Sequence, residues 1–163
     1  TSKLKPVSSY RVYSMKEAQA IADEFISNGG EGAVIKKLDA IWQDGTSKDM
    51  VKIKEIYDAD LYCVGIKLGK GKYEGKIGSV ILQTSCGRIE VDCGSGLTDF
   101  DRNKNPDEFI GKIIEIQYNK FIQSKKDKPA SLYLPRFVEV REDKNTATSY
   151  EEIALWNVSY NSL

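Results

Sequence analysis

Two lysines separated by a single residue are the first feature of this sequence that could do chemistry. Lys52 and Lys54 lie in an apolar segment that begins at Met50. Alternate residues of a β-strand point to the same face, so we expect the two ammonium groups to lie about 7 Å apart. Cations at this spacing repel each other unless an anion lies between them, and a nucleotide phosphate would meet that need. The alternative is a solvated lysine face on an edge strand.

A glutamate that follows a glycine pair is the second candidate. Glu31 comes directly after Gly29 and Gly30 and precedes an apolar segment that ends at Lys36. Glycines allow the backbone to approach a ligand closely, and carboxylate oxygens are ligands that Mg²⁺ prefers. Glu31 could therefore hold a divalent metal ion, whereas the alternative is an exposed loop carboxylate.

A cluster of charges at the end of a later apolar segment is the third candidate. Arg141, Asp143 and Lys144 follow the segment that ends at Val140. The two cations could stabilise a departing pyrophosphate, whose negative charge grows as it leaves, and Asp143 could fix their geometry. The alternative is a charged strand end without a catalytic role.

The composition excludes several other kinds of site. The 163 residues include no histidine, which excludes a Ser-His-Asp or Cys-His centre within the chain. Cys63, Cys86 and Cys93 form no CxxC pair, so we expect free thiols on strands rather than a disulfide framework or a zinc site. The formal net charge is zero, so any contact with nucleic acid must come from local basic patches.

The elements that position the first two candidates follow from the spacing of apolar residues. We expect a short strand over Val7 to Val12 and a helix that begins at Ser14. Ser14 and Glu17 have the spacing of a capping box, and a glycine pair ends the helix. Two strands are expected next: Gly32 to Leu38 and Met50 to Ile56.

After Asp58 the sequence predicts strands and hardly any helix. The five expected strands are Leu61 to Lys67, Gly78 to Ser85, Arg88 to Cys93, Lys112 to Phe121 and Leu132 to Val140. A short helix near Pro106 to Ile110 interrupts them after the third strand, which suits a small closed OB barrel. The last stretch is polar, and Ile153, Leu155 and Trp156 could dock as a final amphipathic turn.

Three of these clusters, in their order and spacing, resemble motifs IV, V and VI of ATP-dependent DNA ligases. They are Glu31-Gly32-Ala33-Val34-Ile35-Lys36, Lys52-Ile53-Lys54, and the segment from Leu134 to Lys144. The stretch from Cys93 to Asp99 and the ending Arg141-Glu142-Asp143-Lys144 are similar to bacteriophage ligases of the T-even type. The resemblance implies a mixed α+β remnant of a nucleotidyltransferase domain over residues 1–56, an all-β OB-fold barrel over 57–144, and a tail over 145–163.

The resemblance also implies an activity and roles. The resemblance implies that the chain is the C-terminal portion of an enzyme that seals nicks in duplex DNA through a lysine–AMP intermediate, with ATP and Mg²⁺ as cofactors. The residues it places at the nucleotide are Glu31, Lys36, Lys52 and Lys54, with Glu31 at the metal. The resemblance also implies a catalytic role for six residues: Glu31, Lys52, Lys54, Arg141, Asp143 and Lys144. The last three act only in the first step, the adenylation of the enzyme by ATP.

The nucleophile of this family lies in a KxDG motif, which the sequence lacks. Lys37-Leu38-Asp39-Ala40 comes nearest, but Ala40 stands where the glycine should be. Covalent catalysis of this kind needs an activated lysine. We therefore expect a fragment of an enzyme that is inactive by itself.

DNA contacts are expected in two lysine-rich loops and one turn. The loop residues are Lys70 and Lys72 in the first loop and Lys120, Lys125 and Lys126 in the second. Such loops suit phosphate neutralisation without sequence readout. The turn from Gly94 to Leu97 resembles a ligase loop that packs against the minor groove beside the nick, with Leu97 as an apolar wedge. A purely structural turn is the alternative.

Two rival interpretations stay open. The same motifs serve RNA ligases and mRNA capping enzymes, and the barrel could instead be a non-enzymatic module that binds single strands. Such a module stacks bases on aromatic side chains, for which the candidates are Tyr62, Tyr118, Phe121 and Tyr133. The ligase interpretation implies nicked double-stranded DNA and the N-terminal remainder of the enzyme as partners, no membrane, and a monomer in the cytoplasm, which is the host's if a phage encodes it.

Overall fold

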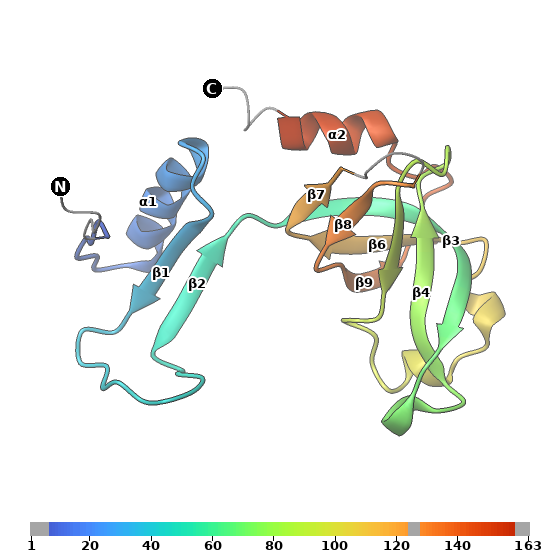
Figure 1. Ribbon diagram of the computed structural model, residues 1–163, viewed down its shortest axis with the longest axis horizontal. Coiled ribbons are helices and arrows are strands. Elements are labelled where there is room, and N and C mark those ends of the chain that lie inside the picture. Colours follow the sequence, from blue (N-terminus) through green and yellow to red (C-terminus); the bar gives the residue numbers. More distant parts are fainter. Residues whose placement is uncertain (1–6, 124–127, 159–163) are drawn as a thin grey trace. The chain divides into compact units, whose positions relative to one another are not determined.

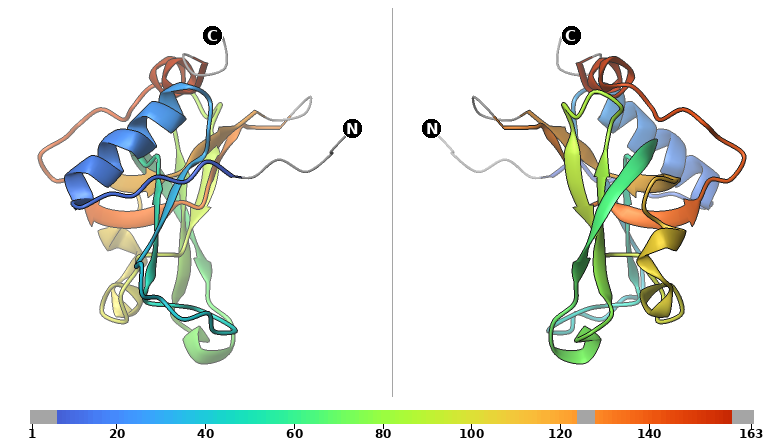
Figure 2. Two further views of the ribbon diagram at one scale, coloured as in Figure 1. Left: turned by 90° about the vertical axis from the view of Figure 1, so that its left-hand side faces the viewer. Right: turned by 90° about the vertical axis from the view of Figure 1, so that its right-hand side faces the viewer.

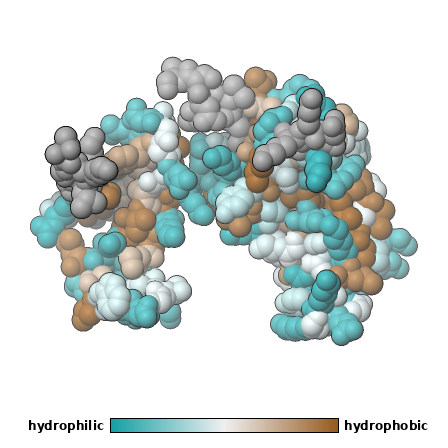
Figure 3. All heavy atoms as spheres, in the orientation of Figure 1, coloured by the Kyte–Doolittle hydropathy of each residue, from teal (hydrophilic) through white to brown (hydrophobic). Residues whose placement is uncertain are grey.

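The computed structural model describes residues 7–123 and 128–158 (Figure 1). The chain divides into two compact units, Thr1–Glu55 and Ile56–Leu163. Each unit has its own secondary structure and its own buried residues, and hydrophilic and hydrophobic residues are mixed over the visible face of each (Figure 3). No helix within the described ranges is long and apolar enough to cross a membrane.

In the first unit a helix packs on a two-stranded antiparallel sheet. The helix is α1 (Met15–Ser27), and the strands are β1 (Gly32–Lys36) and β2 (Met50–Lys54). Helical spacing brings Ala18, Ala22 and Ile26 to one buried face of α1. The two strands predicted in this part are confirmed, each shorter than expected at its C-terminal end.

The start of α1 is where the sequence predicts it, with one difference in the cap. The Ser14 hydroxyl accepts a hydrogen bond from the Glu17 N–H. The Glu17 carboxylate, however, accepts from the backbone N–H of Tyr13 at 2.7 Å, so the reciprocal bond of a capping box is displaced by one residue. The expected strand over Val7 to Val12 is wrong: this segment is irregular and mostly exposed, since the sheet of this unit contains only β1 and β2.

The second unit is built on a five-stranded antiparallel sheet in the order β5-β4-β3-β6-β9. Its strands are β3 (Tyr57–Leu68), β4 (Ile77–Gln83), β5 (Glu90–Cys93), β6 (Ile113–Tyr118) and β9 (Arg136–Val140). The Phe137 N–H donates to the Ser95 carbonyl at 2.8 Å, which joins the segment after β5 to β9. This bridge brings the two edges of the sheet together, as an OB barrel requires.

Two of the predicted strands are each divided in the structure. Lys112 to Phe121 becomes β6 and β7 (Lys120–Ile122), and Leu132 to Val140 becomes β8 (Ser131–Tyr133) and β9. Leu134 has a φ of +52°, which turns the chain before Pro135. As a result β7 and β8 leave the barrel sheet and pair as a separate hairpin.

Short helices and the tail complete this unit. The expected short helix is confirmed as a 3-10 turn at Pro106–Glu108, and two further turns occur at Gly71–Tyr73 and Asp101–Asn103. The tail carries α2 (Tyr150–Val158), which lies across one end of the barrel in the views of Figures 1 and 2. Of the three residues expected to dock, Ile153 is fully buried in the barrel core and Leu155 is exposed. The side chain of Trp156 is not among those that the structure describes.

Candidate functional site

The lysines of motifs IV and V lie on one face of the small sheet. In the register of β1 and β2, Gly32 pairs with Lys54, Val34 with Lys52, and Lys36 with Met50. Directly paired residues of antiparallel strands point to the same side. Lys36, Lys52 and Lys54 therefore share one face, which we call the lysine face, and all three are exposed.

Close packing of the two strands depends on a glycine at the edge of this face. Gly32 has a φ of +132°, and a Cβ there would lie 2.1 Å from the Ile53 carbonyl oxygen. Any side chain would push β1 away from β2 beside Lys54. The glycine therefore belongs to the geometry that brings motif IV against motif V.

Glu31 lies directly before β1 and is exposed. Within the described part of the chain, no group of three or more His, Cys, Asp and Glu side chains could hold a metal ion. Mg²⁺ in nucleotide enzymes is often held by one or two carboxylates together with substrate phosphates. Glu31 fits as one such ligand, and the remaining ligands would have to come from the nucleotide, water or other residues.

Lys37, the nearest match to the family nucleophile, is held as a cation. Its ammonium group donates to Asp49 at 2.6 Å. The hydrogen bond and the charge of Asp49 raise the pKa of Lys37 above its ordinary value. A nucleophilic lysine must lose its proton, so this environment opposes that role.

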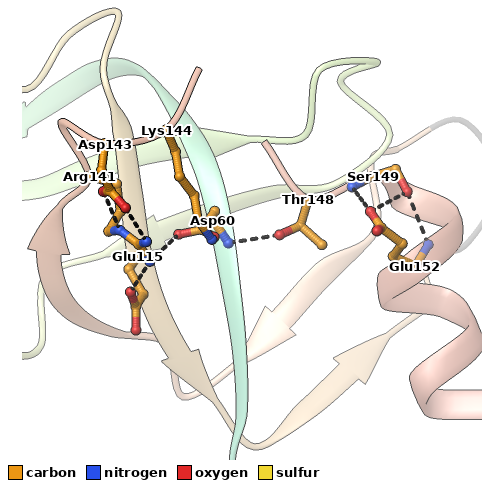
Figure 4. A network of polar contacts seen from close by, with 8 residues as sticks. All are labelled: Asp60, Glu115, Arg141, Asp143, Lys144, Thr148, Ser149 and Glu152. Carbon is orange, nitrogen blue, oxygen red and sulfur yellow. Dashed lines mark hydrogen bonds and ion pairs between the residues drawn. The ribbon is translucent and has the colours of Figure 1, made fainter. Parts of the chain in front are cut away.

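The motif VI residues form a dense network of charges on the barrel (Figure 4). The Nε and one terminal nitrogen of Arg141 bond both oxygens of Asp143, at 2.8 and 2.7 Å. The other terminal nitrogen donates to Glu115 at 2.6 Å and lies 3.5 Å from Asp60. Lys144 forms an ion pair with the second oxygen of Asp60. We call these five residues the motif VI network.

These contacts shift the charged groups in a consistent direction. The hydrogen bonds that Arg141 donates to Asp143 and Glu115 raise its pKa. The hydrogen bonds from Arg141 lower the pKa of the Asp143 carboxyl to about 2. Asp143 is thus hydrogen-bonded to Arg141, whereas Lys144, whose geometry it was also expected to fix, is paired with Asp60. Asp60 and Glu115 were not predicted, because each is far from Arg141 in sequence and lies on another strand.

The network borders a cavity of about 780 Å³. Five carboxylates line it, namely those of Asp58, Asp60, Glu115, Asp143 and Glu152, against the two cations of Arg141 and Lys144. The lining is therefore negative by three charges. A pyrophosphate anion would be repelled from this arrangement as long as the two cations keep these carboxylate partners.

The turn expected to carry an apolar wedge at Leu97 differs from that expectation in which apolar residue is exposed. Leu97 is only 7% exposed and packs in the barrel core, so it is not a wedge in this structure. Phe100, three residues later, is 74% exposed. Of the two apolar residues on this short turn, one faces the core and the other faces solvent, and the sequence alone does not tell which.

A buried arginine holds this turn against the neighbouring lysine loop. The Arg102 guanidinium donates to the carbonyls of Ile77, Gly78 and Gly94, at 3.0, 2.7 and 2.6 Å. It also stacks on the Tyr73 ring at 4.2 Å. Sequence reasoning missed Arg102, because a basic residue in a loop is usually solvated. Its contacts connect the segment that carries Phe100 to the loop that carries the first lysine pair.

The predicted DNA-binding lysines are distributed over two places. Lys70 and Lys72 are exposed beside the Arg102 turn, and Lys72 lies 3.8 Å from Asp99 of that turn. Lys120 is exposed at the start of β7. Lys125 and Lys126 lie outside the described residues. Only the first pair is thus shown to lie beside the turn.

The aromatic residues proposed for single-strand stacking do not form an open platform. Tyr118 is 1% exposed. Phe121 packs edge-on against Tyr150 of α2, and the Tyr62 hydroxyl donates to the Asn145 carbonyl. Among the four, only Tyr133 is largely exposed. Base stacking needs open ring faces, so this arrangement does not favour the single-strand module.

Comparisons with known proteins agree with the order of these motifs. Residues 1–54 match the family described as ATP dependent DNA ligase domain, and residues 68–141 match DNA ligase OB-like domain. The chain is 36% identical over 154 residues to the DNA ligase of Enterobacteria phage T4, covering 87% of this chain and 31% of that ligase. It is 29% identical over 181 residues to the DNA ligase of Thermococcus onnurineus, covering 93% and 32%.

Solved structures give the same result. The structure titled Pmar-Lig_PreS3 superposes with a TM-score of 0.69 at 25% identity, over 77% of this chain and 30% of that one. A structure from a structure-function analysis of Lig E DNA ligases superposes with a TM-score of 0.65 at 25% identity, over 82% and 49%. The chain spans about a third of the length of the curated relatives that it matches. It belongs to the ATP-dependent DNA ligase family and corresponds to the C-terminal region of these enzymes, from the end of the nucleotidyltransferase-type domain through the OB-like domain.

Proposed function

We propose that the complete protein seals nicks in duplex DNA through a lysine–AMP intermediate, and that this chain supplies contacts to the nucleotide phosphates and to DNA. The observation that carries this proposal is the lysine face. Three cations gather there on one side of a two-stranded sheet, in the order expected of motifs IV and V. The two ligase domain matches lie in the same order along the chain.

At the lysine face, Lys52 and Lys54 would bind the phosphate oxygens of ATP, with Lys36 beside them. Glu31 would contribute one carboxylate to a Mg²⁺ ion. When bound, the ion would neutralise negative charge on the phosphates. The exposure of all four side chains suits a site whose other walls come from a larger domain.

On the barrel, Arg141 and Lys144 would act in the first step, when pyrophosphate leaves. Asp143 would orient Arg141 through the two hydrogen bonds described above. The surrounding carboxylates mean that these cations must change partners before they meet a phosphate.

For DNA, we propose a surface made of the two segments that Arg102 connects. Lys70 and Lys72 would neutralise backbone phosphates, and Phe100 would supply the exposed apolar contact that Leu97 does not. The Lys104 ammonium lies 5.0 Å from the centre of the Phe100 ring, so a cation lies beside the exposed aromatic side chain. Lys120 would add a contact from the start of β7, and Lys125 and Lys126, which lie outside the described residues, are proposed to add two more. Nicked double-stranded DNA is the proposed substrate.

The proposal is tested with radiolabelled ATP and a nicked duplex. The complete protein should form a covalent adduct with AMP and seal the nick, whereas this chain alone should form no adduct. A stable adduct on the isolated chain would contradict the assignment of the nucleophile to another part of the protein. Sealing of nicked RNA in preference to nicked DNA would instead favour an RNA ligase.

The DNA surface is tested by binding of this chain to a fluorescent nicked duplex. F100A should weaken binding about tenfold, as expected when an aromatic contact to DNA is lost. L155A removes another largely exposed apolar side chain, from α2, and serves as the matched control. Equal affinities of the two variants would reject Phe100 as a contact, and preference for single strands over the nicked duplex would favour the single-strand module.

A further inference from the structure

The motif VI network contains two carboxylates that the family motif does not include. Glu115 comes from β6 and Asp60 from β3, whereas Arg141 follows β9. These three strands are adjacent in the sheet, so their side chains meet on the barrel surface. All the donor nitrogens of Arg141 consequently face carboxylates of the same unit.

The charge of this surface conflicts with the task proposed for its cations. A leaving pyrophosphate carries several negative charges, while the cavity lining is negative by three. Arg141 and Glu115 are each about one-fifth exposed, so water screens their attraction only partly. Polyphosphate must therefore compete with Glu115 and Asp60 for the same donors.

Resting on the proposed function, we propose that Asp60 and Glu115 are positioning residues that hold Arg141 and Lys144 on the barrel and neutralise them. The two cations contact the nucleotide only after they exchange these carboxylates for phosphate. ATP is then bound in the first step at the expense of this internal network. Steps in which motif VI takes no part proceed with the network intact.

The construction around Asp60 supports a holding role. Its backbone N–H donates to the Thr148 hydroxyl at 2.9 Å, and its carbonyl accepts from the Thr148 N–H at 2.7 Å. One carboxylate oxygen pairs with Lys144, while the other is buried and has only the Arg141 contact at 3.5 Å. This oxygen therefore has capacity to accept a shorter bond if Arg141 moves.

The segment after Lys144 keeps Asp60 in place. Ser149 and Glu152 form a reciprocal cap at the start of α2, in which the Ser149 N–H and hydroxyl donate to the Glu152 carboxylate and the Glu152 N–H donates back. Ile153, one residue later, is buried in the core. Thr148 is thus anchored beside β3, as Figure 4 shows.

The test separates the first step from the last in the complete enzyme. Enzyme–AMP formation is measured over a range of ATP concentrations, and sealing is measured on a nick that already carries AMP. E115Q should lower the KM for ATP in the first step by about fivefold, since one competing charged contact is removed. Sealing of the pre-adenylated nick should stay at the wild-type rate. E24Q, on an exposed face of α1, is the matched control.

Three outcomes would overturn this inference. They are an unchanged KM, a raised KM, and an equal change in both steps of the kind a folding defect produces. D60N provides the second variant and should shift the KM in the same direction as E115Q. R141A separates the inference from the proposed function: if R141A leaves enzyme–AMP formation at the wild-type rate, the role of motif VI itself is wrong. If R141A slows that step while E115Q leaves the KM unchanged, only the inference fails.

Discussion

The two groups of cations expected at the nucleotide differ in what surrounds them. On the lysine face, Lys36, Lys52 and Lys54 are exposed, and none of the ion pairs found among the described residues involves them. In the motif VI network, Arg141 and Lys144 are paired with three carboxylates. The first group carries an unbalanced positive charge, and the second lies in a surface of net negative charge.

For the proposed contacts with phosphate, this difference predicts two different routes of binding. Exposed lysines can attract an anion directly, because no ion pair found among the described residues occupies Lys36, Lys52 or Lys54. Cations inside a network of carboxylates bind an anion only by exchange, and the balance depends on small differences between two sets of charged contacts. A permanent contact suits the first group, and a contact limited to one step suits the second.

The strongest way to break this comparison is to remove the exposed charges. K52A/K54A should slow enzyme–AMP formation by the complete protein about a hundredfold to a thousandfold, since phosphate loses preorganised electrostatic partners. The rate is measured with labelled ATP. K48A, in the exposed loop before β2, is the control and should keep the wild-type rate. Equal rates for the double variant and this control would show that the lysine face does not contact the nucleotide.

The comparison is sharpened by destabilising only the unit that carries the motif VI network. I153A removes a fully buried side chain and should destabilise the second unit by about 2–4 kcal/mol. Hydrogen exchange should report this loss in β3 and β6, while the amides of β1 and β2 keep their protection. L155A, on the same helix but exposed, should change stability by less than about 0.5 kcal/mol. Equal loss of amide protection in both units would mean that the two units, and with them the two groups of cations, unfold together as one cooperative unit.

The smallest expected effect is the contribution of the Asp143–Arg141 ion pair to stability, which should disappear at low pH. The pKa of Asp143 is lowered from 3.8 to about 2 by Arg141, so the folded state favours the charged form. The resulting stability is present above about pH 4 and is lost as the pH falls towards 2. Wild type should therefore melt slightly above D143N near pH 6, and the two should converge near pH 2. D44N, in an exposed loop of the first unit, should show no such convergence. A constant difference at all pH values would contradict the assigned ion pair.

Much of the fold could be predicted from local patterns. The start of α1 after Ser14, the two strands of the first unit and the predominance of strands after Asp58 all follow from helical or alternating spacing of apolar residues. The strand boundaries at Asn119 and Leu134 could not be predicted. Between these residues the chain leaves the barrel sheet and β7 pairs with β8, which is decided by the tertiary structure and not by the local sequence. The strand expected over Val7 to Val12 is wrong for a related reason: among the described residues, no strand pairs with this segment, and pairing is decided by the tertiary structure.

The sequence by itself determined which residue types stand at motifs IV, V and VI, and that Lys52 and Lys54 share a face, because strand periodicity is a local property. Only the tertiary structure decided their partners. Asp60 lies 84 residues before Lys144, and Glu115 lies 26 before Arg141, so only the pairing of β3, β6 and β9 brings them together. It also decided that Leu97 enters the core while Phe100 stays in solvent. Electrostatic and packing energies depend on distance in space, and neighbours across a sheet are not neighbours along the chain.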